Sequence, residues 1–304
     1  MQVQSRKSLA PVFVTSFSNQ QIDDQMNTQI KQIAAGLSGS QFDSAVMHAS
    51  LQLAKRTGAG IDTYLIRPLP DDPQLLMASG FLGETFKNFI HQAEKTIAEF
   101  DRTARASFET ATQNCPTVSA TYHNPLKDLA REFATVVWGT DLAVMAHPAL
   151  VNLHYYKTAV LDAIADSARP VLLLPEDKYL GDFKHVLMVW RADTSHARAL
   201  ADALPLLSIA DKVTLLSVAD EAYLSPGSDV AKAFLKHHDV DVDDLTVSED
   251  ERLTPKLIDK ACDAHDASLL VISGGLQSDL IDSFVTGIGR RATRKPNRAI
   301  LAIG

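Results

Sequence analysis

Two similar segments decide the fold of this chain: Lys31-Gln-Ile-Ala-Ala-Gly-Leu-Ser-Gly-Ser40 and Lys184-His-Val-Leu-Met-Val-Trp190. Each is followed by a helical pattern and then by a second apolar segment. These second segments are Gly60-Ile-Asp-Thr-Tyr-Leu-Ile66 and Lys212-Val-Thr-Leu-Leu-Ser-Val218. A strand, an amphipathic helix and another strand are typical of a parallel βαβ crossover. Because the two units start about 150 residues apart, the size of one α/β domain, the sequence predicts a tandem repeat.

The remaining apolar and helical segments follow one order in both halves. Strands are expected at 31–37, 60–67, 117–122, 141–146 and 170–175, and again at 184–190, 212–218, 241–247, 268–273 and 299–303. Helices are expected at 41–57, 83–113, from 125 and at 155–168, and again at 195–208, 227–238, 253–265 and 279–295. Because apolar strands between helices indicate a parallel sheet covered on both faces, we predict an α/β fold with two doubly wound five-stranded parallel sheets.

The chain divides into an arm and two domains. Residues 1–30 lie outside the repeat and are expected to form an arm or an extra strand. A polar, turn-forming stretch at 176–182 separates a first domain, 31–176, from a second, 183–304. We expect the two domains to pack as an intramolecular pseudo-dimer, and a further homodimer of the chain is left open.

Composition excludes several classes of partner. The net charge of −8 argues against general affinity for nucleic acid or for an anionic membrane. No apolar run is long enough to span a membrane, and the first residues lack the apolar stretch of a secretory signal. The only cysteines, Cys115 and Cys262, cannot build a disulfide framework. We therefore predict a cytoplasmic protein with reduced thiols.

Several segments together resemble a known family. They are Ile33–Val46, Leu53–Ala59, Val186–Trp190, Ala197–Leu207 and Asp162–Pro175. In order and spacing they resemble the domains of universal stress proteins, over about residues 31–304. The resemblance implies a tandem member of bacterial type with Rossmann-like sheets of strand order 3-2-1-4-5, similar to adenine-nucleotide hydrolases.

Nucleotide-binding members of that family place an Asp at the end of strand one and a glycine-rich loop after strand four. Glycines let the backbone approach phosphates at a helix N-terminus. In the first half Ser38 takes the Asp position, and the loop reads Ala146-His-Pro-Ala149, without glycine before Lys157-Thr158. Pro148 also lacks a backbone donor. This half is expected not to bind phosphate.

The second half keeps part of the motif. Arg191 takes the Asp position, and the loop reads Ser273-Gly-Gly-Leu276 before Thr286-Gly287. The resemblance makes six residues candidates for cofactor binding: Arg191, Ser273, Gly274, Gly275, Thr286 and Gly287. The candidate cofactor is ATP or another adenine nucleotide. Arg191 is expected either to pair with an acid such as Asp193 and block the adenine pocket, or to offer its guanidinium to a different anion.

No group of residues has the spacing of a catalytic or metal site. His147, His154, Tyr155 and Tyr156 surround the first strand-four loop, and His237-His238-Asp239 ends a helix; surface or capping roles are expected for these histidines. The acidic run from Asp239 to Asp244 is expected at a solvated strand edge. Five cations, Arg290, Arg291, Arg294, Lys295 and Arg298, are expected to complement a helix C-terminus, with an anion or partner patch as the alternative.

The sequence therefore favours a non-enzymatic stress-response module with a degraded nucleotide motif. It would bind an unidentified protein partner, or a small ligand in the second half. The alternative is a universal stress protein that binds ATP in its second domain and has slow ATPase or phosphotransfer activity. A third interpretation, an adenylating enzyme of the related fold, rests on Ser273-Gly-Gly-Leu-Gln-Ser-Asp279, but that segment follows the fourth strand, not the first.

Overall fold

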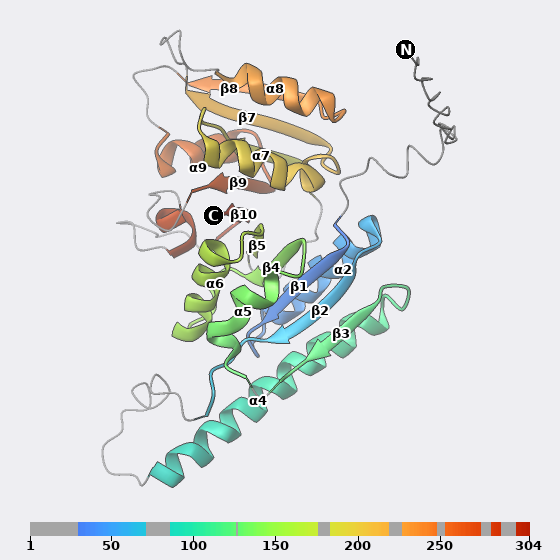
Figure 1. The fold of residues 1–304 in the computed structure, drawn as a ribbon, viewed down its shortest axis with the longest axis vertical. Helices are drawn as coiled ribbons and strands as arrows, with labels where there is room; N and C mark the ends of the chain where they lie inside the picture. Colours follow the sequence, from blue (N-terminus) through green and yellow to red (C-terminus); the bar gives the residue numbers. More distant parts are fainter. Residues whose placement is uncertain are drawn as a thin grey trace, which may run out of the picture.

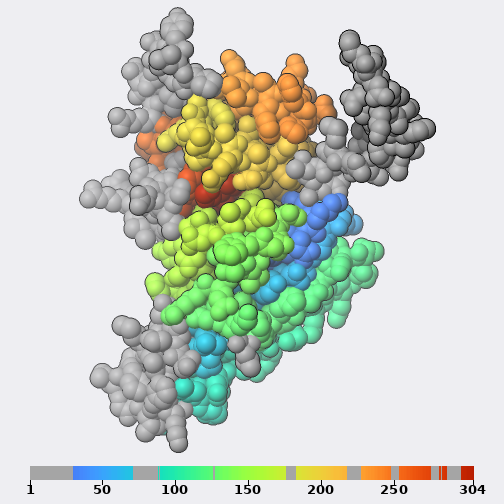
Figure 2. Space-filling view, in the orientation of Figure 1, coloured from blue at the N-terminus to red at the C-terminus, as the bar shows by residue number. Residues whose placement is uncertain are grey.

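The structure is a computed structural model of the 304-residue chain. It describes residues 30–70, 86–125, 127–175, 183–218, 227–247, 253–274, 281–286 and 296–304. These residues form one ten-stranded sheet with helices packed against it (Figure 1). The first half of the chain builds one side of the sheet and the second half builds the other, and the two halves lie directly against each other in the space-filling view (Figure 2).

The first half alternates strands and helices. Its elements are β1 (Gln32–Leu37), α2 (Asp43–Thr57), β2 (Gly60–Leu65), α4 (Phe86–Gln113), β3 (Ala120–His123), α5 (Leu129–Val137), β4 (Leu142–Ala146), α6 (His154–Asp166) and β5 (Val171–Leu174). The long helix α4 lies along α2, β2 and β3 at the outer end of this half (Figure 1).

The second half repeats the order. Its elements are β6 (His185–Val189), α7 (Thr194–Leu207), β7 (Lys212–Val218), α8 (Ser228–His237), β8 (Val242–Val247), α9 (Pro255–Ala264), β9 (Leu269–Ser273), a π-helical turn η1 (Asp282–Thr286) and β10 (Ala299–Ile303). Within the predicted helix 279–295, the structure describes only residues 281–286, and most of these form the π turn.

The strand order confirms the predicted fold class. The sheet runs β3-β2-β1-β4-β5-β10-β9-β6-β7-β8, so each half has the order 3-2-1-4-5. All pairs within a half are parallel, whereas β5 and β10 pair antiparallel, with Ile300 beside Leu173. The two parallel sheets therefore join at their last strands into one continuous sheet. The proposed domain boundaries stay a prediction, because residues 1–29 and 176–182 lie outside the described residues.

Burial explains why the inner strands are apolar throughout. Every residue of β4, β5, β6, β9 and β10 is buried, as expected for parallel strands covered on both faces. No residue of the edge strand β8 is buried, and its two acids are paired: Asp243 with Lys212 at 2.9 Å and Asp244 with Lys232 at 2.7 Å. This part of the acidic run lies at a solvated edge. In the part of the chain that the structure describes, no helix is long and apolar enough to cross a bilayer.

Most strand boundaries lie within two residues of the prediction, but one strand begins three residues later than expected. The strand expected at 117–122 begins at Ala120, because Cys115 and Val118 form a hydrogen-bonded turn after α4. The carbonyl of Cys115 accepts a hydrogen bond from the N–H of Val118 at 3.2 Å. The residues of this turn therefore cannot pair as part of the strand.

Candidate functional site

The candidate site lies where parallel strands end beside each other at a reversal of strand order. Ligands of doubly wound sheets bind at this switch point. In the first half it lies between β1 and β4, and in the second between β6 and β9. The two equivalent places have different contents.

In the first half a buried carboxylate fills the end of β1. Asp43 is fully buried in the first turn of α2. Its Oδ1 accepts from the backbone N–H of Ser38 at 2.8 Å and from the Ser38 hydroxyl at 2.9 Å, and its Oδ2 accepts from the N–H of Gly39 at 2.8 Å. Burial raises the pKa of Asp43 to about 6, against the lowering effect of these hydrogen bonds. The Asp43 carboxylate therefore occupies the N–H groups of Ser38 and Gly39, in the turn after β1.

A buried tyrosine joins the two strands of the same switch point. The hydroxyl of Tyr156 on α6 donates to the carbonyl of Gly36 on β1 at 3.0 Å. It also accepts from the N–H of Ala146 at the end of β4 at 2.9 Å. Tyr156 is 0% exposed. Tyr156 therefore links β1 to β4 through its hydroxyl.

His147, in the loop after β4, is buried and links this loop to η1 of the second half. The prediction of a surface or capping role for His147 was wrong. His147 is 2% exposed, its Nδ1 accepts from the N–H of Ala149 at 3.2 Å, and its Nε2 lies 2.7 Å from the carbonyl of Phe284 in η1. Burial lowers its pKa to about 4, so the ring is neutral and Nε2–H donates to that carbonyl. Tyr155 is buried as well, whereas His154 is exposed at the start of α6.

In the second half Arg191 does not form the predicted pair with Asp193. Arg191 is exposed beyond the end of β6. Asp193 caps α7 instead: its Oδ1 accepts from the N–H of His196 at 2.9 Å, from the Ser195 hydroxyl at 2.7 Å, and lies 2.8 Å from Nδ1 of His196. The N-cap position of α7 and the neighbouring imidazole supply the local partners of Asp193. These hydrogen bonds keep the pKa of Asp193 below its ordinary value, although partial burial opposes them.

His196 was not among the predicted site residues. It is 4% exposed, and its ring lies edge-on to Trp190, with ring centroids 6.5 Å apart. Burial lowers its pKa, and Asp193 opposes that shift. In this neutral ring Nδ1–H donates to Asp193, which leaves Nε2 as an acceptor. Nε2 is buried and has no hydrogen-bond partner among the described residues.

Ser273 and Gly274 lie at the carboxyl end of β9. Val186 pairs with Leu269 and Met188 with Val271, after which β6 ends at Val189 and β9 at Ser273. Ser273 is 3% exposed, and within the described chain its hydroxyl has no partner. Gly274 has a φ of +134°, and its N–H donates to the carbonyl of Ile303 at 3.0 Å. The second switch point therefore has Trp190 directly after β6, and Ser273 and Gly274 at the end of β9.

The other predicted residues are only partly described. Gly275 and Gly287 lie outside the described residues. Thr286 is the last residue of η1, and only its backbone is described. Sequence reasoning missed Asp43 and His196. Both are polar residues in the first turn of the helix that follows a half's first strand, and that position was the available signal.

The cation cluster is also partly described. Arg298 is 7% exposed, and its Nη2 contacts Oδ1 of Asp259 at 3.1 Å and Oδ1 of Asp263 at 2.5 Å, both on α9. It pairs with acids of a neighbouring helix, so its expected role at a helix C-terminus was wrong. Arg290, Arg291, Arg294 and Lys295 lie outside the described residues. Among described residues, no three histidines, cysteines or acids are grouped as a metal site.

Comparison with known proteins supports the fold. No protein-family model matches the chain, and no curated protein matches it. A universal stress protein structure from Archaeoglobus fulgidus is similar with a TM-score of 0.64 and 16% identity, over 90% of this chain and 96% of that one. Another, from Pseudomonas aeruginosa, has a TM-score of 0.51 and 12% identity, over 90% and 93%. The chain has the fold of these universal stress protein structures over most of its length.

Proposed function

We propose that this chain is a tandem universal stress protein that works as a non-enzymatic binding module, with its ligand site in the second half. One observation carries the proposal: near the second switch point two buried polar atoms, Nε2 of His196 and Oγ of Ser273, have no partners among the described residues. At the first switch point Asp43 and Tyr156 are hydrogen-bonded within the protein, and the buried hydroxyl of Tyr155 lacks such a partner there. Buried polar groups in folded proteins are ordinarily paired. A bound molecule would supply these partners.

The chemistry of the two atoms limits the ligand. Nε2 of neutral His196 accepts a hydrogen bond, so the ligand needs a hydroxyl or amino donor there. Trp190 provides an aromatic wall beside it. Exposed Arg191 stands where an acidic residue would receive adenine or ribose in a family-type site. These features favour a small uncharged molecule with hydrogen-bond donors over a nucleoside triphosphate.

Thermal denaturation tests the proposal. A ligand that binds only the folded state raises stability by RT ln(1 + [L]/Kd). Uncharged compounds rich in hydroxyl and amino donors, adenosine among them, are compared with Mg-ATP. We expect a rise in Tm with at least one uncharged compound, little change with Mg-ATP, and loss of the rise in His196→Phe. If no compound raises Tm, or if His196→Phe responds like the parent, the proposed ligand site is wrong.

A second candidate function is ATP binding by the second half with slow hydrolysis or phosphotransfer. Gly274 favours it, because a φ of +134° directly after β9 is a conformation that glycine adopts and phosphate loops use. The N–H of Gly274 is already bound to Ile303, which removes one donor from such a loop. A rise in Tm with Mg-ATP together with release of phosphate would establish this function and refute the non-enzymatic proposal.

The proposal also includes the cytoplasm as the location and the predicted domains 31–176 and 183–304. Both cysteines are free thiols, as expected for a reducing compartment. The antiparallel junction of β5 with β10 supports an intramolecular pseudo-dimer of the two domains. Mass photometry of the full chain separates a monomer from a further homodimer.

A further inference from the structure

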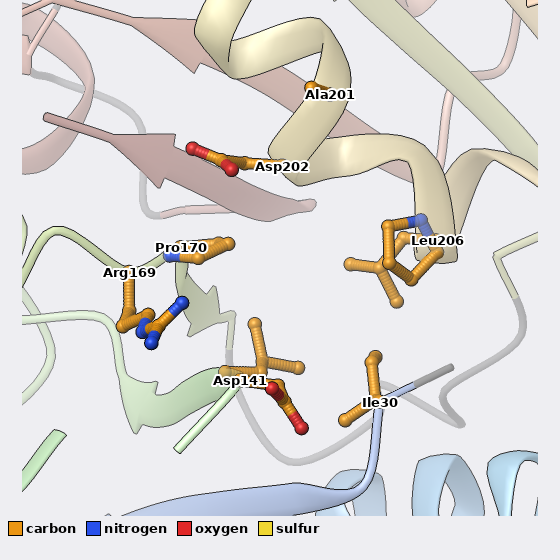
Figure 3. A pocket seen from close by; sticks show the side chains of 9 residues that line it. Ile30, Asp141, Arg169, Pro170, Ala201, Asp202 and Leu206 are labelled. Carbon is orange, nitrogen blue, oxygen red and sulfur yellow. The ribbon is translucent and has the colours of Figure 1, made fainter. Parts of the chain in front are cut away.

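A separate cavity of about 160 Å³ lies between the two halves (Figure 3). The first half contributes the starts of β4 and β5, together with Ile30 before β1, and the second half contributes the middle of α7. The lining residues are Ile30, Asp141, Leu142, Arg169, Pro170, Ala201, Asp202, Pro205 and Leu206. This place is distinct from the switch point of either half, because it lies at the amino ends of the first half's strands.

The cavity has an apolar base and a charged rim. Ile30, Leu142 and Leu206 are buried, whereas Arg169 and Asp202 are exposed. In Figure 3, Arg169 and Asp202 lie on one side of the cavity, and Ile30 and Leu206 lie on the other. A molecule in the cavity would therefore meet charges at one end and aliphatic side chains at the other.

The charged end offers both signs. One guanidinium nitrogen of Arg169, Nη2, donates to the carbonyl of Trp138 over a long distance of 3.4 Å. A guanidinium group has five N–H donors, so Arg169 has further donors for a ligand. Desolvation raises the pKa of Asp202, and nearby Arg198 and Arg169 oppose this shift. The third charged group, Asp141, is held in place because its Oδ2 accepts from the N–H groups of Lys31 at 2.7 Å and Gln32 at 3.0 Å.

The cavity volume limits the size of the ligand. An apolar cavity of about 150 Å³ admits benzene, so 160 Å³ has room for roughly six to nine non-hydrogen atoms. A guanidinium binds a carboxylate through two parallel hydrogen bonds, and a carboxylate binds an ammonium group. A small molecule that carries a carboxylate, an ammonium group and a short aliphatic chain matches all three parts of the lining.

We propose that this cavity binds an aliphatic α-amino acid of about the size of valine or leucine. Arg169 binds the carboxylate, Asp202 faces the ammonium group, and the side chain packs against Ile30 and Leu206. Because the walls come from both halves, the bound amino acid bridges them. The proposal does not rest on the ligand site of the second half.

Calorimetry on the full chain tests this with three matched probes: leucine, 4-methylpentanoic acid, which lacks the amine, and isoamylamine, which lacks the carboxylate. We expect leucine to bind at least tenfold more tightly than either analogue. Equal binding of leucine and one analogue would show that the cavity recognises only that charge, and absence of leucine binding would show that the cavity takes no amino acid; both results overturn the proposal.

Variants locate the binding. Arg169→Gln and Asp202→Asn are expected to weaken leucine binding at least tenfold, and Ala201→Phe is expected to abolish it by filling the cavity without changing a charge. Arg102→Gln and Asp211→Asn are the controls, because both residues are exposed and away from the cavity lining. All five changes are at exposed positions, so each protein is expected to fold. Binding that survives Ala201→Phe, or that the controls weaken equally, would refute the assigned site.

Discussion

Ser38 and Asp43 are joined twice in the buried interior: the backbone N–H and the hydroxyl of Ser38 both donate to the same Asp43 oxygen, at 2.8 and 2.9 Å. Both residues are fully buried. The carboxylate holds the turn after β1 in one conformation, and burial raises its pKa to about 6 from an ordinary 3.8. Asp43 therefore binds a proton more tightly in the folded protein than in the unfolded chain.

The first prediction follows from this difference. Between pH 4 and pH 6 the folded state holds the Asp43 proton and the unfolded state does not, so this group's contribution to the free energy of unfolding falls as pH rises. About two pKa units correspond to roughly 3 kcal/mol over that window. The difference between urea denaturation of the parent and of Asp43→Asn, measured at several pH values, isolates the contribution.

The second prediction concerns His147, whose effect on stability has the opposite sign. Its pKa is about 4 in the folded protein against 6.5 ordinarily, so its contribution is complete above pH 6.5 and is lost as pH falls toward 4. The two effects oppose each other in the parent protein. Asp43→Asn should therefore show stability that rises with pH, and His147→Leu should show stability that falls with pH. His154→Leu, at an exposed position, is the control. Parallel pH profiles for the two variants would contradict both assignments.

The third prediction concerns Tyr156. Tyr156→Phe keeps the packing of the ring but leaves the carbonyl of Gly36 and the N–H of Ala146 without their hydrogen bonds. An unsatisfied buried polar group costs about 1–3 kcal/mol, so a loss of that size or more is expected in urea denaturation. Tyr122→Phe, which removes a partly buried bond to Asp101, should cost less. An equal loss in the two variants would mean that the Tyr156 hydrogen bonds between β1 and β4 contribute no more to stability than the partly buried bond of Tyr122.

Periodicity predicted the fold because buried parallel strands must be apolar on both faces. The runs 141–146 and 268–273 correspond to β4 and β9 within a residue at their amino ends. The antiparallel junction of β5 with β10 was not predicted. Both strands are apolar throughout, as any inner strand is, and nothing in that pattern says which strand lies beside them.

The candidate site was harder to predict, because its polar residues obtain their roles from burial and from distant partners. His147 resembles a surface histidine in the sequence, yet its partner Phe284 is 137 positions away. Asp193 was predicted as the partner of Arg191 because it is close in sequence. In the structure Asp193 caps α7 and accepts a hydrogen bond from the N–H of His196. Ser38 and Arg191 were correctly located at the ends of β1 and β6, since strand ends follow from the apolar runs.

The fourth prediction tests whether the nucleotide motif of the second half is degraded. Arg191→Asp restores an acceptor for adenine or ribose, and Ser273→Gly with Leu276→Gly restores backbone freedom after β9. The triple variant should bind ATP at least about tenfold more tightly than the parent in calorimetry, a difference of about 1.4 kcal/mol. Micromolar binding of ATP by the parent would show that the motif is functional as it stands.

The fifth prediction compares two glycines with nearly the same φ angle. Gly39 has a φ of +76° and Gly58 a φ of +74°, so alanine at either position adopts a left-handed conformation that costs about 1–2 kcal/mol. A Cβ at Gly58 would meet open space, whereas one at Gly39 would lie 2.4 Å from Cβ and 2.6 Å from Cα of Phe100. Gly58→Ala should therefore lose only the conformational cost, and Gly39→Ala should lose more, because α4 must shift away from the turn after β1. Thermal denaturation of the two variants measures the difference, and equal losses would show that α4 does not pack against Gly39 in solution.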